Sequence, residues 1–300
     1  AATLLGKIYL RNHDYANAKT YIDMVLNSGQ YELESDFKYV WSENNKYGKE
    51  MIFALLHETG NNAAEIACHF GPSDHPEVPG RWQYYGVSLP FWRSYDKEDP
   101  RREFFYYDYT GDAKRDDQSD YGFHYMVPEE GVTVVPNDTT KYMQNVATMK
   151  YTYDMISDAY YDGRTICIFR LSDVILCKAE IENNLNGPAA ALPYLNQIRA
   201  RAGAPEYGKH NRFPAPSTKE AMNDAILKER GYELVFEFQR RADLIRFGKY
   251  EEVVNAHLKK LGIAQPTNVT SSLRYFPYPL NDAQLNPNWQ QRILHGCRNK

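Results

Sequence analysis

A run of three glutamates followed by two arginines has the spacing in this sequence that best suits acid–base catalysis or ion pairing. Glu229, Glu233 and Glu237 follow one another at four-residue steps, and Arg240 and Arg241 come directly after them. On a helix this spacing places the three carboxylates in one stripe. Such a stripe could supply a catalytic acid and base, or it could form ion pairs that fix how helices pack.

The spacing favours the structural role. Like charges at four-residue steps repel by about 0.2–0.5 kcal/mol, so the stripe needs basic partners. Catalytic carboxylates are expected in a cleft with separated pKa values, whereas these three share one continuous stripe. We therefore predict a structural ion-pair network rather than an active site. Its predicted members are Glu229, Glu233, Glu237, Arg199, Arg201, Arg240 and Arg241.

No other pattern indicates catalysis, a metal or nucleic-acid binding. The sequence lacks the H-E-x-x-H, G-x-S-x-G, Walker and G-x-G-x-x-G patterns. The acidic residues between 112 and 120 do not have EF-hand spacing, and the four cysteines form no C-x-x-C pair. The net charge of −4 gives no basic face for phosphate backbones. We expect no enzyme activity, no metal and no cofactor.

Helix pairs are the elements that must position these residues. Segments close to the tetratricopeptide repeat length recur at 1–27, 168–202 and 217–248. In the last of these, Ser217 and Glu220 form a capping-box pattern and Gly248 ends the segment, so the stripe is predicted to lie on one helical face. A short buried strand is predicted from Glu50. Further strand-like pieces lie at 103–109, 122–127 and 147–153.

Residues 58–87 have a different character. Glycine, proline, asparagine and serine are dense there and no hydrophobic period persists, which predicts a long loop. Long loops inside compact domains are usually functional or mobile. The chain also holds 25 tyrosines, 13 phenylalanines and 4 tryptophans. Tyrosine offers an apolar face and a polar hydroxyl, which suits a surface that meets partly polar ligands.

Four segments resemble signatures of the SusD/RagB family. ILKERGYELVFEFQRRADLIRFGKY resembles the family's ER-x-x-EL and R-x-x-DL-x-R-[WF]-G patterns. The other three are the first helix hairpin with the following E-x-I-F, the segment TICIFRLSD…IRARAG, and the terminal LNPN-x-x-Q. Asp99-Pro100-Arg101 also resembles a D-P-R of the family. The four signatures agree in order and spacing and cover both ends of the chain.

The resemblance implies a mainly α fold. It consists of a tetratricopeptide-like helix-pair scaffold with long irregular loops and a few short strands. We expect a single SusD-like domain over 1–300 that lacks its N-terminal part. Within it, a helix hairpin plus strand occupies 1–57, a variable loop-rich region on the ligand side occupies 58–164, and the C-terminal helical region occupies 165–300.

The resemblance also implies a function. SusD-like proteins are lipid-anchored on the outer-membrane surface of Bacteroidetes, bind oligosaccharides without cleaving them, and dock on a SusC-like TonB-dependent transporter. The lipid anchor would precede this chain, in which no apolar run is long enough to span a membrane. Three alternatives stay open: a peptide-binding SusD-like protein, a tetratricopeptide-type interaction scaffold, and a glycan-processing enzyme with paired loop carboxylates.

Sugar binding would need flat aromatic rings for the C–H faces of the sugar and polar side chains for its hydroxyls. The segment between Gly80 and Gly86 matches this best, and the helix start that follows it is the second choice. The alternative is that these rings form core beneath the loop, which is favoured for Trp92 on its predicted helix. The candidate glycan-binding residues are Arg81, Trp82, Tyr84 and Tyr85, and then Trp92 and Tyr95.

Overall fold

The structure is a computed structural model of the chain. It describes residues 1–60, 62–64, 66–72, 75–77, 82–111, 123–130, 140–154, 162–260, 269–274 and 285. The chain divides into two compact units, Ala1–Gln239 and Arg240–Lys300.

The first helix pair is α1 (Ala2–Arg11) and α2 (Tyr15–Leu26). The predicted turn between them is confirmed: His13 has a φ of 59°, and the Asp14 side chain accepts a hydrogen bond from the backbone N–H of Asn17. Gly6 lets the helices approach closely, because a Cβ there would lie 2.9 Å from the Ile22 side chain. This contact explains a glycine in the middle of a helix, where it otherwise costs about 1 kcal/mol.

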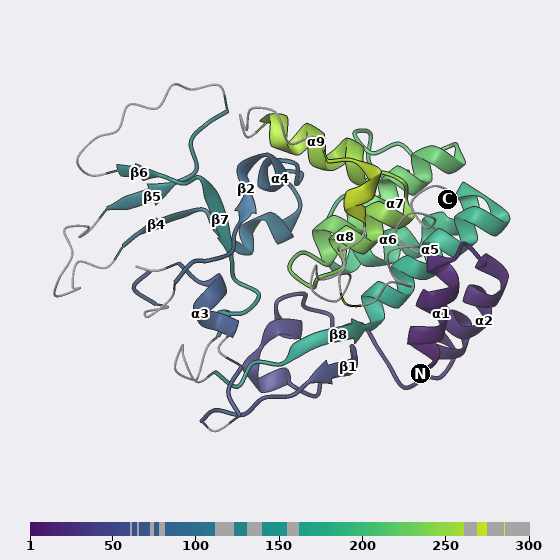
Figure 1. The fold of residues 1–300 in the computed structure, drawn as a ribbon, viewed down its shortest axis with the longest axis horizontal. Helices are drawn as coiled ribbons and strands as arrows, with labels where there is room; N and C mark the ends of the chain where they lie inside the picture. The colour runs from purple at the N-terminus through teal and green to yellow at the C-terminus, as the bar shows by residue number, and fades with distance from the viewer. Residues whose placement is uncertain are drawn as a thin grey trace. The chain divides into compact units, whose positions relative to one another are not determined.

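The second pair is α5 (Leu171–Asn186) and α6 (Pro188–Arg201), joined at Gly187 with a φ of 90°. Helix α5 lies at the centre of the scaffold, in contact with α2, α6 and α7 (Lys219–Glu233). Figure 1 shows α1, α2, α5, α6 and α7 gathered on one side of this unit. The predicted mainly α, helix-pair fold is confirmed.

The continuous helical stripe predicted over 217–248 is wrong. Helix α7 begins after Thr218, whose side chain accepts from the N–H of Ala221, and it ends at Glu233. Phe236 and Phe238 each have a φ of 60°, a conformation that non-glycine residues rarely adopt, so the chain turns instead of continuing the helix. Tertiary contacts hold this turn, since the Tyr151 hydroxyl donates to the Phe236 carbonyl at 2.9 Å.

Strand β1 (Met51–Leu55) pairs antiparallel with β8 (Ile166–Arg170). The predicted strand after Glu50 is confirmed, but its predicted burial is wrong, because Phe53 and Leu55 are exposed. Among the described strands this sheet has two members, and one of its faces is open. The two strands also form the stem of the loop-rich region, because the chain enters that long insertion along β1 and returns to the helices along β8.

Between these two strands lie short elements. Strands β2, β7 and β3 form one sheet in that order, and β4, β5 and β6 form another, in which β5 and β6 are parallel. The strand predicted at 147–153 lies earlier, at Asn145–Thr148, and a turn follows it. The elements between the two strands are α3 (Ile66–Phe70), β2 (Val87–Ser88), α4 (Leu89–Arg93), η3 (Pro100–Glu103), β3 (Phe105–Tyr106), β4 (Asp108–Thr110), β5 (His124–Met126), β6 (Thr140–Tyr142) and β7 (Asn145–Thr148), where η marks a 3₁₀ helix. Two further 3₁₀ helices, η1 (Tyr39–Trp41) and η2 (Glu43–Asn45), precede β1.

A hydrophobic cluster lies under the loop-rich region. Its rings are in contact: Phe70 lies 4.7 Å from Tyr151 between ring centroids, and Trp41 lies 5.9 Å from Tyr151. Phe37 packs on Phe104 in the same cluster, at 5.6 Å. The loop-rich region therefore has a packed base of its own, joined to the helical scaffold through β1 and β8.

The second unit contains α8 (Arg240–Arg246), α9 (Tyr250–Lys260) and the 3₁₀ helix η4 (Ser271–Arg274). Gly248 separates the first two helices with a φ of 67°. The Arg274 guanidinium donates to Glu251 at 2.6 Å, which ties η4 to α9. The terminal LNPN signature falls outside the described residues apart from Leu285. Over the described ranges, no helix combines the length and apolar character needed to cross a membrane.

Candidate functional site

The glutamates singled out from the sequence lie in a buried ion-pair network. Glu229 accepts from Arg101 and Arg199, each at 2.7 Å. Glu233 accepts from Arg101 at 3.0 Å and from Arg170 at 2.7 Å, and it also pairs with Arg201. The α7 carboxylates therefore join α6, η3 and the end of β8.

Glu237 completes the network from the turn after α7. It accepts from the Lys150 ammonium at 2.6 Å and from the Arg170 Nε at 2.7 Å. Burial lowers the pKa of Lys150 to about 8, against the raising effect of the Glu237 carboxylate. For Glu233, burial alone would raise the pKa, but the charges of Arg201, Arg170 and Arg101 outweigh it and hold the pKa well below its usual value.

The charges in this network are matched. Among the described residues, ion pairs join five cations to five carboxylates, and none of these ten side chains is more than 5% exposed. Each carboxylate is enclosed by its partners, which suits a structural role and leaves no acid or base open to a substrate. The members are Arg101, Lys150, Arg170, Arg199 and Arg201, with Glu50, Asp99, Glu229, Glu233 and Glu237.

Arg240 and Arg241, predicted as partners of the stripe, belong to the second unit. Arg241 donates to the carbonyls of Leu273 at 3.0 Å and Arg274 at 2.8 Å. Arg101, Arg170 and Lys150 are partners of the stripe that were not predicted from the sequence. For Arg101 and Arg170 a signal was present, because both fall on the family signatures.

The exposed aromatic group is the candidate ligand site. Trp82, Tyr84 and Tyr85 are 39%, 65% and 52% exposed. The Trp82 and Tyr84 ring centroids lie 5.4 Å apart with an interplanar angle of 34°. The His69 ring lies at 5.0 Å from Trp82, 5.4 Å from Tyr84 and 6.3 Å from Tyr85. We call these four residues the aromatic platform; three of its rings are open to solvent.

Two backbone hydrogen bonds fix the platform to α3. The N–H of Trp82 donates to the Cys68 carbonyl at 2.7 Å, and the N–H of Tyr85 donates to the His69 carbonyl at 3.1 Å. Between them, Gln83 has a φ of 50°. The loop is therefore held against α3 by backbone hydrogen bonds at both ends of the Trp82–Tyr85 segment. His69, which lies outside the candidate residues predicted from the sequence, belongs to the same group.

The remaining glycan-binding candidates have different positions. Trp92 and Tyr95 are only 5% and 3% exposed, so we remove them from the candidate site as a correction. The Trp92 indole N–H donates to the Arg102 carbonyl at 3.2 Å. The Tyr95 ring stacks on Tyr232 at 4.1 Å. Both fill the core because this segment packs against strands β2 and β7 and against Tyr232 of α7. Arg81 lies outside the described residues.

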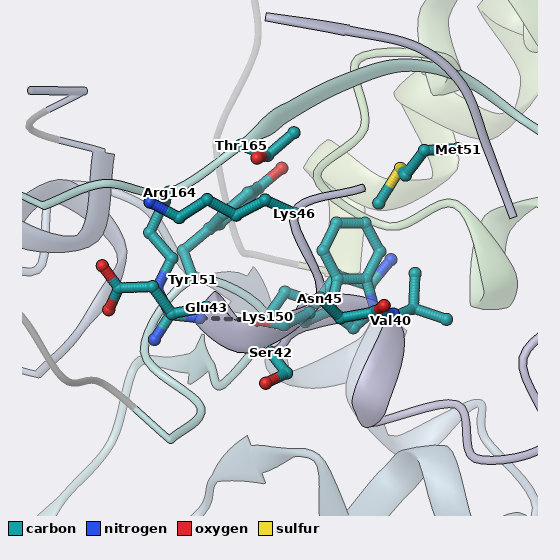
Figure 2. Close-up of a pocket in the computed structure, with 11 residues that line it drawn as sticks. Val40, Ser42, Glu43, Asn45, Lys46, Met51, Lys150, Tyr151, Arg164 and Thr165 are labelled. Carbon is teal, nitrogen blue, oxygen red and sulfur yellow. Dashed lines mark hydrogen bonds between the residues drawn. The ribbon is translucent and has the colours of Figure 1, made fainter. Parts of the chain in front are cut away.

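A small cavity lies beside the ion network. Figure 2 shows Lys150, Tyr151, Arg164 and Thr165 around it, together with Lys46. Its volume of about 10 Å³ is room for a single water molecule. The cavity is therefore too small for a sugar ring.

The described ranges hold no group of three histidine, cysteine, aspartate or glutamate side chains that could bind a metal ion. Cys68, Cys167 and Cys177 are buried thiols, and burial raises the pKa of the Cys167 thiol well above its usual value. The acidic residues between 112 and 120 fall outside the described residues.

Helix pairs packed around α5 give this chain a tetratricopeptide-like frame. The sequence model of the SusD family matches residues 49–295, and the chain belongs to this family. SusD family proteins are non-catalytic glycan-binding proteins.

Three similar proteins illustrate the likeness. SusD-like protein P25 of Formosa agariphila is 39% identical over 120 residues, which cover 40% of this chain and 22% of that protein. SusD-like protein P38 of the same organism is 25% identical over 271 residues, covering 83% and 52%. Surface glycan-binding protein A of Bacteroides thetaiotaomicron, solved with laminarihexaose, has a TM-score of 0.69 at 21% identity, covering 95% and 61%. The chain thus spans about half the length of P38.

Proposed function

We propose that this chain is part of a cell-surface protein that captures oligosaccharides, and that the aromatic platform binds them. The observation that carries the proposal is the exposed group of Trp82, Tyr84 and Tyr85 on a SusD family scaffold. A structural neighbour was solved with laminarihexaose, which supports an oligosaccharide as the ligand class.

The platform has the chemistry that sugars need. The C–H faces of a pyranose ring pack on the exposed indole and phenol rings, and polar side chains beside them bind the hydroxyls. Gln83 and Asn145 stand next to the rings, with the Gln83 amide 3.5 Å from the Asn145 side-chain oxygen. We propose Arg81 as a further polar member from the sequence. Because backbone hydrogen bonds already fix the platform to α3, the protein loses little conformational entropy when a sugar binds.

The proposal includes a partner and a location. As in SusD-like proteins, the captured oligosaccharide is handed to a SusC-like TonB-dependent transporter at the outer membrane. The protein would be held at the cell surface by an N-terminal lipid anchor outside this chain. The proposed role is binding and delivery, without cleavage.

Isothermal titration against a panel of host and plant glycans tests the proposal. Wild type is compared with Trp82→Ala, and with Tyr47→Ala as a matched control, because Tyr47 is exposed outside the platform. Loss of a stacking ring at a binding hot spot costs about 2 kcal/mol, or roughly thirtyfold in affinity. We expect that loss for Trp82→Ala and wild-type affinity for Tyr47→Ala, with unchanged melting temperatures.

Other outcomes have defined meanings. Glycan binding that Trp82→Ala leaves intact would keep the function and reject the platform as its site. A panel in which wild type binds nothing would reject glycan capture. Transporter delivery is tested separately, by co-purification of the full-length protein with its membrane partner.

One observation favours a second candidate, a peptide-binding or protein-interaction scaffold. A hollow of about 470 Å³ lies between α2, α5 and α6, with Tyr31 and Tyr194 among its lining residues. Tetratricopeptide-like helix pairs generally provide interaction surfaces. Peptides included in the same titration panel distinguish this candidate, since binding there would depend on Tyr194 and not on Trp82.

A further inference from the structure

Phe70 is the residue where the platform meets the core. It ends α3, directly after His69, and it is buried. The His69 ring turns to the exposed rings of Trp82 and Tyr84. The Phe70 ring instead enters the hydrophobic cluster, where it lies 4.7 Å from Tyr151 and 5.0 Å from Phe236.

The same Phe70 ring also touches the platform. Its centroid lies 5.2 Å from that of Tyr85, which is half-exposed. One side chain therefore contacts both a ring offered to solvent and the rings of the core. Aromatic pairs at this separation attract one another beyond the area that they bury.

One of the core residues that Phe70 contacts, Phe236, has an uncommon backbone conformation. Phe236 has a φ of 60°, and its carbonyl accepts from the Tyr151 hydroxyl at 2.9 Å. The next residue, Glu237, is fixed by Lys150 and Arg170. Strained backbone persists where the surrounding structure over-determines it, and such strain is common at ligand-binding sites.

We propose that Phe70 is a positioning residue that fixes the Tyr85 ring for glycan binding by joining it to the turn at Phe236 and the ion network behind it. The proposal rests on the proposed function of the platform. Phe70 itself touches no ligand. It lowers the cost of binding, because a ring that is already fixed loses less freedom when a sugar stacks on it.

The test compares Phe70→Leu with Phe37→Leu. Both phenylalanines are buried in the same cluster, but Phe37 packs on Phe104 and the cations of Lys150 and Arg201. Both variants are expected to melt at a lower temperature. With affinities measured well below both melting temperatures, Phe70→Leu is expected to weaken glycan binding about three- to tenfold and Phe37→Leu to leave it unchanged.

A double-mutant cycle with Tyr85→Ala shows whether Phe70 acts through Tyr85. If it does, Tyr85→Ala lowers affinity less in the Phe70→Leu background than in wild type. Fully additive losses would overturn the proposal, as would wild-type affinity in Phe70→Leu or an equal loss in Phe37→Leu. Should Phe70→Leu not fold, Phe70→Met keeps the volume while removing the ring, and the same outcomes apply.

Failure of the two proposals can be told apart. If Trp82→Ala weakens glycan binding and the cycle is additive, the platform keeps its function and the role of Phe70 is rejected. If wild type binds no glycan, the function of the platform is rejected and the role of Phe70 with it.

Discussion

The buried ion network and the aromatic platform belong to the same unit but are built in opposite ways. Network side chains such as Arg170 and Glu233 are fully buried and paired, and they join segments far apart in the sequence. The platform rings are exposed, and they come from two segments close in the sequence and are clipped together by backbone hydrogen bonds.

The difference separates stability from affinity. A buried charge that loses its partner is uncompensated, so a change in the network is felt by the whole fold. An exposed ring that is removed leaves the fold nearly as stable, because water already surrounds it. Mutations in the two regions should therefore affect different measurements, and Phe70 is the place where both change together.

The largest effect is expected from Arg170→Ala. Its guanidinium pairs with Glu50, Glu233 and Glu237, so its removal leaves three buried carboxylates short of a partner. The free energy of unfolding should fall by about 3–5 kcal/mol, as measured by denaturant titration. The control Arg212→Ala breaks an exposed pair with Asp96 and should cost less than about 1 kcal/mol. Equal losses in both variants would contradict a special role for the buried network.

Trp92 and Trp82 allow the buried and the exposed regions to be compared with the same residue type. Trp92→Ala empties a buried site and should lower the free energy of unfolding by about 3 kcal/mol. Trp82→Ala should change it by less than about 0.5 kcal/mol, because the ring is exposed. Thermal unfolding of both variants checks this, and a stable Trp92→Ala protein would return Trp92 to the list of ligand-binding candidates.

Acid should weaken the network gradually. The arginine partners of Glu233 outweigh its burial and depress its pKa, and for Asp173 the charges of Lys7 and Arg230 do the same. A depressed folded-state pKa gives stability that is present above the unfolded pKa, near 4.5 for Glu233, and lost as the pH falls below it. Denaturant titrations from pH 6 to pH 3 should show a loss on the order of 2 kcal/mol for Glu233 and about 1 kcal/mol for Asp173, whose unfolded pKa is lower, near 3.8. A flat profile over that interval would contradict the pairing.

The helix pairs could be predicted because their signals are local. The turn at His13 and the glycines at 187 and 203 sit where the hydrophobic period breaks, and the structure places positive φ at each of them. The end of α7 could not be predicted, because the apolar and acidic pattern continues through Phe236 and Glu237. Contacts from Tyr151, Lys150 and Arg170 decide that turn, and they come from segments more than sixty residues away.

The site was predictable in composition but not in placement. The run from Trp82 to Tyr85 marked a loop rich in rings, and the structure leaves these rings exposed. Trp92 and Tyr95 are aromatic residues of the same kind, yet α4 and the turn after it place both rings in the core. Burial depends on which face of a five-residue helix meets the sheet, and such a short helix gives too few turns for a period to show it.

The stem formed by β1 and β8 has a consequence for how this protein can vary. Because β1 and β8 are paired, the segment between them begins and ends at neighbouring positions on the helical frame. Closing this long loop therefore adds little to the cost of folding. We call the segment between β1 and β8 the cassette. Asp99, Arg101 and Lys150 lie inside the cassette and reach back into the ion network. A cassette transplanted from a relative should change the ligand and keep the frame, provided that it carries these three charges.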